Sequence, residues 1–319
     1  MHIRWLERAC VTCLVTIVVA PSSWAQTDAG ARPFSVARTP WGHPDFQGVW
    51  TNQTPVPLER PEALAGKRTF APEEAARFEQ TAFQRLAQRI GDDVELSGEI
   101  DEVWLETQHG RVPPNLRTSL IVEPDDGKVP FTPQGRARWE AVPRPLAPKG
   151  ADRPEDRDEA ERCITTGGVL VPNPFYNNYH QILQAPDHLV IVTEMMHEAR
   201  VIPLDGRPHA GAGVRSWLGD SRGRWDGTTL EVETTNFNAR RLFQGATAGL
   251  HLLERFTPID PDTLAYRLTV TDPATYTQPW VVEHALRRAD GALYEVDCHE
   301  GNYGLAGILS GARAQEAAR

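Results

Sequence analysis

The chain has 319 residues, a hydrophobic content of 40% and a formal net charge of −10 at neutral pH. This length and composition suffice for one large domain or two modest ones with a buried core. The acidic balance excludes the basic stripe by which proteins bind nucleic acid or anionic lipid.

The first 25 residues have the order of a secretory signal peptide. Arg4 and Arg8 precede the apolar run Ala9 to Ala20, and the small-residue pattern Ser23-Trp24-Ala25 follows it. A run of 12 apolar residues is too short to cross a bilayer as a helix, but it suits the central region of a cleavable signal. We therefore expect residues 1–25 to be removed before Gln26, leaving a periplasmic or secreted chain with no membrane anchor.

Two cysteines, Cys163 and Cys298, remain after cleavage at that site. Two thiols of one chain in an oxidising compartment are expected to form a disulfide. Closing so long a loop stabilises a fold by about 4 to 5 kcal/mol in the chain-entropy model. The competing interpretations are two buried thiols, or a catalytic Cys298 beside His299.

Residues 26–150 are rich in proline and are predicted to be an irregular segment that wraps around the rest of the chain. One helix is predicted over residues 72–89. Pro72 suits a first helical turn, and the acidic residues after it offset the positive end of the helix dipole. A short strand is expected over Ser119 to Glu123.

Residues 151–319 are predicted to form a β-barrel-like domain. From about Asn177, short alternating segments are separated by turn residues such as Asp226-Gly227. The predicted strands are 179–184, 188–195, 199–204, 215–218, 223–225, 229–234, 251–257, 263–271, 280–288 and 292–298. Sequential strands with tight turns form an antiparallel meander, and about ten of them favour closure into a lipocalin-like barrel or a strongly curled sheet. The fold class is therefore mainly β.

Two of these strands carry a titratable residue on an apolar face. Alternate residues of a strand share a face, so His284 lies with Trp280 and Val282, and Glu194 lies with Val192. A polar group on an apolar face costs free energy unless it is paired. We expect both side chains to point into the barrel and to border one cavity.

The loop from His299 to Tyr303 is expected at the same cavity, because it follows the last predicted strand and is dense in groups that bind or transfer protons. The triplet Gly219-Asp220-Ser221 also occurs around the nucleophiles of serine hydrolases. Here it lies between two predicted strands, without the histidine motif or the strand-to-helix elbow of those enzymes, so a turn is expected instead.

Several segments resemble a large, mostly uncharacterised group of exported bacterial proteins. The stretch Trp217–Leu230, WLGDSRGRWDGTTL, is similar to the signature of that group, although Thr228 stands where the pattern has aspartate. Pro44–Trp50, Leu204–His209 and the run CHEGNY over Cys298–Tyr303 are similar to further segments of it. The resemblance implies export and supplies no reaction.

The sequence shows no zinc-protease spacing, no phosphate-cradling loop and no dinucleotide fingerprint, so we predict no cofactor. A metal is not excluded, because five histidines on separate segments could converge: His180, His197, His209, His284 and His299. The candidate catalytic residues are His284, Glu194, His197 and His299. The candidate ligand-binding residues are Arg200 and Arg222, for an anionic group, and Trp217, Trp225, Trp280 and Tyr303.

Three functions remain open. The first is an exported enzyme that acts on a small apolar or aromatic molecule by metal-independent acid-base chemistry, as a lyase, an isomerase or a hydrolase. The second is a binding protein that sequesters such a ligand unchanged. The third is a structural protein of the cell envelope. The enzyme is preferred because titratable residues interrupt apolar faces, and no pattern in the sequence sets the oligomeric state.

Overall fold

The computed structural model describes residues 34–97, 110–142, 150–172, 178–238 and 243–318, except 295, 297 and 299–301, with side chains as far as residue 88 in the first range. The predicted signal peptide and His299 lie outside the described residues.

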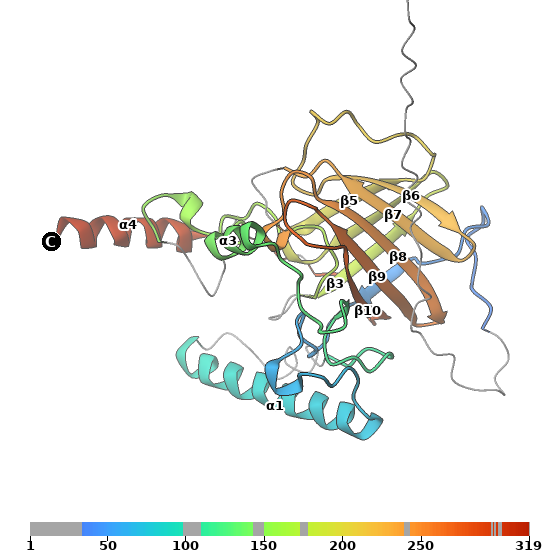
Figure 1. Ribbon diagram of the computed structural model, residues 1–319, viewed down its shortest axis with the longest axis horizontal. Coiled ribbons are helices and arrows are strands. Elements are labelled where there is room, and N and C mark those ends of the chain that lie inside the picture. Colours follow the sequence, from blue (N-terminus) through green and yellow to red (C-terminus); the bar gives the residue numbers. More distant parts are fainter. Residues whose placement is uncertain are drawn as a thin grey trace, which may run out of the picture.

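A nearly closed antiparallel barrel forms the body of the molecule (Figure 1). Its strands follow the order β5-β4-β3-β1-β10-β9-β8-β7-β6, and β2 pairs with β10 outside this path. The bounds are β1 Gly48–Thr51, β2 Ile121–Glu123, β3 Tyr179–Gln184, β4 His188–Thr193, β5 Glu198–Pro203, β6 Asp220–Asp226, β7 Thr229–Thr235, β8 His251–Asp260, β9 Thr263–Thr271 and β10 Trp280–Arg288. The predicted mainly-β class and the antiparallel meander are confirmed.

The barrel has one seam, between β5 and β6. Every hydrogen-bonded pair along the path is antiparallel, so β5 and β6, at its two ends, run in the same direction. Strands with one direction need a long crossover, and residues 204–219 supply it. Side chains fill the seam, because Ile202 and Leu204 pack directly against Gly223 of β6. A Cβ added to Gly223 would lie only 2.6 Å from Leu204 Cδ2 and 2.9 Å from Ile202 Cγ2.

The inner wall follows the period of two that the sequence predicts. On β9, Leu264, Tyr266, Leu268 and Val270 are all buried on one face. The register places His284 of β10 opposite Tyr266, on the same face as the buried Trp280 and Val282. The predicted inward direction of His284 is therefore confirmed.

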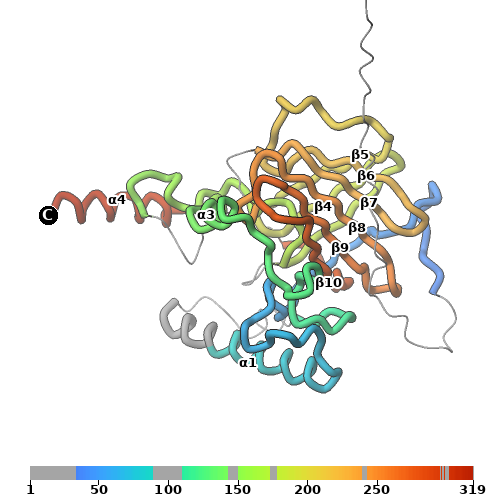
Figure 2. The backbone as a smooth tube through the Cα atoms, viewed as in Figure 1, coloured from blue at the N-terminus to red at the C-terminus, as the bar shows by residue number. Residues whose placement is uncertain are grey.

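Within the described residues, three α-helices lie outside the barrel (Figure 1). They are α1 Pro72–Ser97, α3 Pro133–Ala141 and α4 Tyr303–Ala317, with short 3-10 segments at Glu62–Leu64, Pro154–Asp156, Met195–His197 and Phe243–Gly245. Helix α1 begins at Pro72 as predicted and continues past residue 89. Helix α3 packs against a loop beside β10, where Gly135 approaches the Thr275 backbone. Helix α4 projects away from the barrel (Figure 2) and buries no residue. Among the described helices, none is long and apolar enough to cross a membrane.

Strand assignments differ from the predictions in three places. The strand predicted over residues 215–218 is reduced to an isolated bridge at Ser216, and β6 begins at Asp220, so Asp220 and Ser221 lie in a strand where a turn is expected. Strand β1 arises in the proline-rich segment, where the sequence predicts none, and pairs with β3 and β10. It has four residues, and a strand that short depends on its neighbours rather than on its own propensity. Residues 292–294, predicted to begin a last strand, are not in one. Strand β10 already pairs with β9 and β1, so it has no free edge for another hairpin partner.

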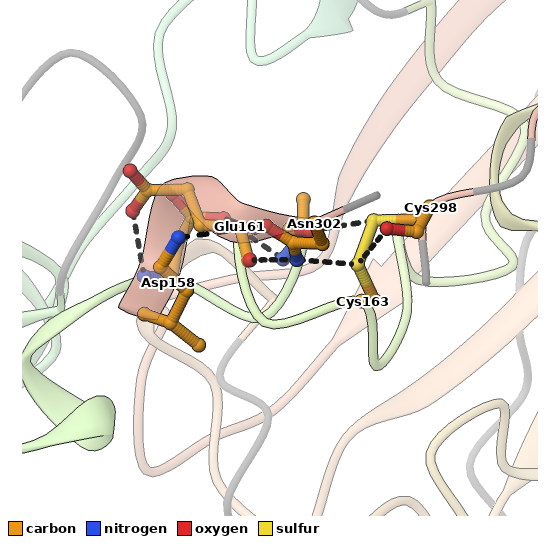
Figure 3. Close-up of a disulfide and its surroundings, with 7 residues drawn as sticks. Asp158, Glu161, Cys163, Cys298 and Asn302 are labelled. Carbon is orange, nitrogen blue, oxygen red and sulfur yellow. Dashed lines mark hydrogen bonds between the residues drawn. A yellow bond between two sulfur atoms is a disulfide. The ribbon is translucent and has the colours of Figure 1, made fainter. Parts of the chain in front are cut away.

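A disulfide joins Cys163 to Cys298, with 5.5 Å between the Cα atoms, and confirms the predicted pairing (Figure 3). Asn302, which caps the start of α4, donates from Nδ2 to Cys163 Sγ at 3.0 Å and to the Glu161 carbonyl oxygen at 3.3 Å. The Asp158 carboxylate accepts from the Glu161 backbone N–H at 3.0 Å. The disulfide therefore fixes the start of α4 against the turn that contains Cys163.

Candidate functional site

The barrel interior contains a cluster of polar side chains from five strands. Its members are His180 of β3, Arg200 of β5, Glu254 of β8, Tyr266 of β9 and His284 of β10, each at most 6% exposed. A buried polar group costs free energy unless it is paired. The hydrogen bonds within this cluster therefore show which of its groups are already paired and which could still bind a ligand.

Three of these residues form a buried ionic group. Arg200 Nη1 lies 2.9 Å from Glu254 Oε2, and Arg200 Nη2 donates to Oε1 at 3.0 Å. The Tyr266 hydroxyl donates to the same Oε1 at 2.9 Å. Burial, and then the Glu254 charge, raise the pKa of Tyr266, so its hydroxyl keeps the proton that it donates. The bidentate geometry offsets much of the cost of burying two charges and leaves the group with no net charge.

Two imidazoles lie close to this group, and both are neutral at physiological pH. Burial lowers the pKa of His180 to about 3, with a smaller effect of His284 and Arg200. Burial also lowers the pKa of His284 to about 4. The His284 ring lies 4.6 Å from the Tyr266 ring, centroid to centroid. A general base works best with a pKa near the working pH, so these imidazoles are better suited to hydrogen bonding than to proton abstraction.

Two ring nitrogens of this cluster, His180 Nε2 and His284 Nδ1, are buried without a hydrogen-bond partner among the described residues. His180 Nδ1 lies 3.1 Å from the Thr193 hydroxyl. His180 Nε2 is buried, and no hydrogen-bond partner for it occurs in the part of the chain that the structure describes. A neutral imidazole has one donor and one acceptor nitrogen, so Nε2 offers whichever role Nδ1 does not take.

Residues 165–171, here called the inner segment, enter the barrel and contact the cluster. The Leu170 carbonyl oxygen accepts from His284 Nε2 at 2.6 Å and from Asn52 Nδ2 at 2.9 Å. The Gly168 carbonyl oxygen accepts from Arg200 Nη1 at 2.8 Å. The Glu198 carboxylate accepts from the Thr166 hydroxyl at 2.7 Å. These contacts hold the inner segment at the end of the barrel where β5 begins.

The opposite end is covered by the chain that precedes β1. Phe46 is fully buried, and its ring contacts that of Trp225 at 5.1 Å. Gln184 accepts from the Phe46 backbone N–H at 2.6 Å and donates to the Pro44 carbonyl oxygen at 3.0 Å. Trp225, a predicted ligand-binding residue, therefore lies at this end of the barrel.

The other predicted ligand-binding residues are dispersed. Trp280 is buried on the inner wall, and its ring lies parallel to that of Phe243 at 6.2 Å. Arg222 pairs with Asp220 at 2.5 Å beside the crossover. Trp217 lies partly buried within that crossover, and Tyr303 is 82% exposed at the start of α4. Of these residues, Trp225 and Trp280 are on the inner wall.

The face predicted for Glu194 is wrong. The inward residues of β4 are Leu189 and Ile191, so Val192 lies on the outer face. Strand β4 ends at Thr193, and Glu194 adopts a helical conformation with φ −55° and ψ −48°, which removes it from the alternation. Its side chain is nevertheless only 5% exposed. His197 closes the same turn with a positive φ of 52°.

Burial raises the pKa of Glu194 to about 7. The ionised carboxylate therefore lowers the stability of the fold at pH values where it is charged. A carboxyl with a raised pKa in the folded state binds its proton more tightly there, so stability falls as pH rises from about 4.5 to 7. Glu194→Gln should therefore raise the free energy of unfolding by about 2 kcal/mol at pH 8 and change it little at pH 4. Urea unfolding at both pH values measures this, with the exposed Glu62→Gln as control. An equal effect at both values contradicts it.

The structure brings together two of the five histidines that could converge on a metal, His180 and His284. Within the described ranges, no group of three or more His, Cys, Asp or Glu side chains is placed to hold a metal ion. The predicted contact of His284 and Glu194 with the loop from His299 to Tyr303 falls partly outside the described residues and stays a prediction.

No protein-family model matches the chain, and no curated protein is significantly similar to it. Among solved structures, a secretary abundant heat soluble (SAHS) protein from Ramazzottius varieornatus is similar to 41% of this chain and 87% of its own, with 14% sequence identity and a TM-score of 0.24.

Proposed function

We propose that the protein binds a small, uncharged, largely apolar or aromatic molecule inside its barrel. The observation that carries this proposal is the buried His180 Nε2, which lacks a partner among the described residues and lies beside the paired group of Arg200, Glu254 and Tyr266. A buried group of this kind usually meets a ligand or a water molecule. Of the functions that the sequence leaves open, this is the binding protein.

The charge of the interior supports an uncharged ligand. Glu254 already neutralises Arg200, and both histidines are neutral because their pKa values are low. A charged ligand would bring an uncompensated charge into this buried region, at a high cost in free energy. Arg200 is therefore no longer assigned to an anionic group. The buried aromatic rings of Trp50, Tyr266 and Trp280 favour an apolar or aromatic ligand.

Export and family membership belong to the same proposal. The disulfide suits an oxidising compartment, and the signal pattern of residues 1–25 supports export to the periplasm or beyond. The motifs of Trp217–Leu230 and Cys298–Tyr303 support a place in the exported bacterial group.

Acid-base catalysis on the bound molecule is the second candidate, and Glu194 is the observation that favours it. Its carboxyl is buried at the turn between β4 and β5, and its pKa of about 7 suits a general acid or base near neutral pH. Glu194 directly follows Thr193, whose hydroxyl contacts His180 of the interior cluster. A lyase, an isomerase and a hydrolase all remain compatible with such a residue.

Ligand capture tests the proposal. The full chain is purified from the cell envelope, exposed to a small-molecule extract and examined by native mass spectrometry. His180→Asn retains a group that can reach Thr193 and removes Nε2, so we expect the occupancy of the captured molecule to fall about tenfold. The control is His188→Asn, at a half-exposed histidine next to Asp187.

Capture of no molecule by the wild-type chain, or equal capture by His180→Asn, would overturn the binding proposal. Chromatography of the captured molecule after incubation separates binding from catalysis. Conversion that depends on Glu194 favours the enzyme, and recovery of the molecule unchanged favours the binding protein.

A further inference from the structure

We infer that Asn52 and His284 form a binding site for a ligand carbonyl group, which the Leu170 carbonyl of the chain itself occupies in this structure. This inference rests on the proposed function and names the substrate class. The ligand is a small neutral amide, ketone or ester.

The geometry is that of two buried donors that converge on one oxygen. Asn52 Nδ2 and His284 Nε2 lie 2.9 Å and 2.6 Å from the Leu170 oxygen, and the three residues are at most 1% exposed. A carbonyl oxygen only accepts, so His284 must carry its proton on Nε2. The low pKa of His284 leaves this a neutral donor.

The occupant belongs to a segment that the barrel can release without losing its strand pairing. The inner segment contributes no strand, and its contacts with the wall are made largely by side chains such as Arg200 and Glu198. Departure of the segment would leave the donors of Asn52 and His284 buried and unpaired. A ligand that presents a carbonyl oxygen at the same place restores both hydrogen bonds.

The donors also select against other ligands. A carbonyl oxygen has two lone pairs and no hydrogen, which matches two converging donors. An alcohol would add a hydrogen that needs an acceptor of its own. A carboxylate would bring a charge into an interior where Glu254 already neutralises Arg200. Since the Tyr266 ring lies 4.6 Å from the His284 ring, an aromatic substituent on the carbonyl meets an aromatic wall.

A matched pair of probes tests the carbonyl directly. Propiophenone and propylbenzene have similar shapes and differ in one carbonyl group. Calorimetric titration of the full chain should show at least tenfold tighter binding of the ketone. The infrared carbonyl stretch of bound propiophenone should move to lower wavenumber. Hydrogen exchange in residues 165–171 should become faster on binding, because the ligand displaces the inner segment.

Two variants locate the effect. Asn52→Leu removes one donor at similar volume and should reduce the preference for the ketone to about twofold or less while propylbenzene still binds. Asn115→Leu, at a partly buried asparagine that contacts Glu283 on the outer face of β10, is the control. Gly168→Ala acts on the occupant instead, because Gly168 has φ +63° and an added Cβ would lie 2.8 Å from Leu218 Cδ2. It should tighten ketone binding several-fold by loosening the inner segment.

The outcomes separate this inference from the proposed function. Equal binding of both probes leaves the binding barrel standing and overturns the carbonyl site. Binding of neither probe overturns the carbonyl site, and ligand capture decides the proposed function independently. A ketone preference that survives in Asn52→Leu, or exchange in residues 165–171 that slows on binding, places the ketone elsewhere and also overturns it. If Asn52→Leu does not fold, unchanged or weaker ketone binding by Gly168→Ala overturns the carbonyl site in its place.

Discussion

Between pH 7 and pH 5, the free energy of unfolding is expected to fall by about 4 kcal/mol less in a variant that lacks both interior histidines than in the wild type. The variant carries His180→Asn and His284→Gln. Each imidazole has a pKa near its usual 6.5 when the chain is unfolded, and a pKa of about 3 or about 4 when it is folded. Between these values the unfolded chain binds more protons than the folded one. The free energy of unfolding therefore falls as the pH falls below 6.5, with the larger part of the loss reached near pH 4.

The comparison is made between variant and wild type because Glu194 acts in the opposite direction. Its raised pKa makes acid stabilising, and that contribution is the same in both proteins. Urea unfolding of each protein at pH 7 and pH 5 gives the difference. The variant side chains keep groups that can contact Thr193 and the Leu170 carbonyl oxygen, so the loss of titration is separated from the loss of hydrogen bonds. The same pH dependence in both proteins would show that the histidines become protonated inside the fold.

Alternation along single strands is enough to predict part of the interior. It places His284 on the inner wall, and the same rule places Glu254 there, between Leu252 and Phe256, although Glu254 is not among the residues selected from the sequence. Its pairing with Arg200 cannot be predicted from alternation. Strands β5 and β8 are not neighbours, so the ion pair exists only because the barrel curls.

The errors occur where regular structure ends. Extending the alternation of β4 beyond its last residue misplaces Glu194, because the chain turns there. The inner segment has no alternation at all, and its contact with His284 spans 114 residues of sequence. The glycines at 167 and 168, both with positive φ, signal a reversal of the chain, but they do not indicate what the reversed chain meets. Tyr303 is predicted at the cavity from its proximity in sequence to His299, yet it begins an exposed helix.

Removing the disulfide, by Cys163→Ala and Cys298→Ala together, is expected to lower the free energy of unfolding by about 5 kcal/mol while the barrel ladders persist. The bond closes a loop of 135 residues that contains most of the barrel strands, and the chain-entropy model assigns about this value to a loop of that length. Both cysteines lie outside the strands, so their loss removes no ladder hydrogen bond.

Guanidinium unfolding measures the change in stability, and circular dichroism of the folded baseline reports whether the sheet remains. The wild-type chain with its disulfide reduced is the control, because it lacks the bond and keeps both sulfur atoms. Cys163 precedes the inner segment by only two residues, so faster hydrogen exchange is expected there before it appears in the strands. A loss in the free energy of unfolding well below about 1 kcal/mol would contradict this prediction. It would mean that residual structure in the unfolded chain already holds these two positions close together without the bond.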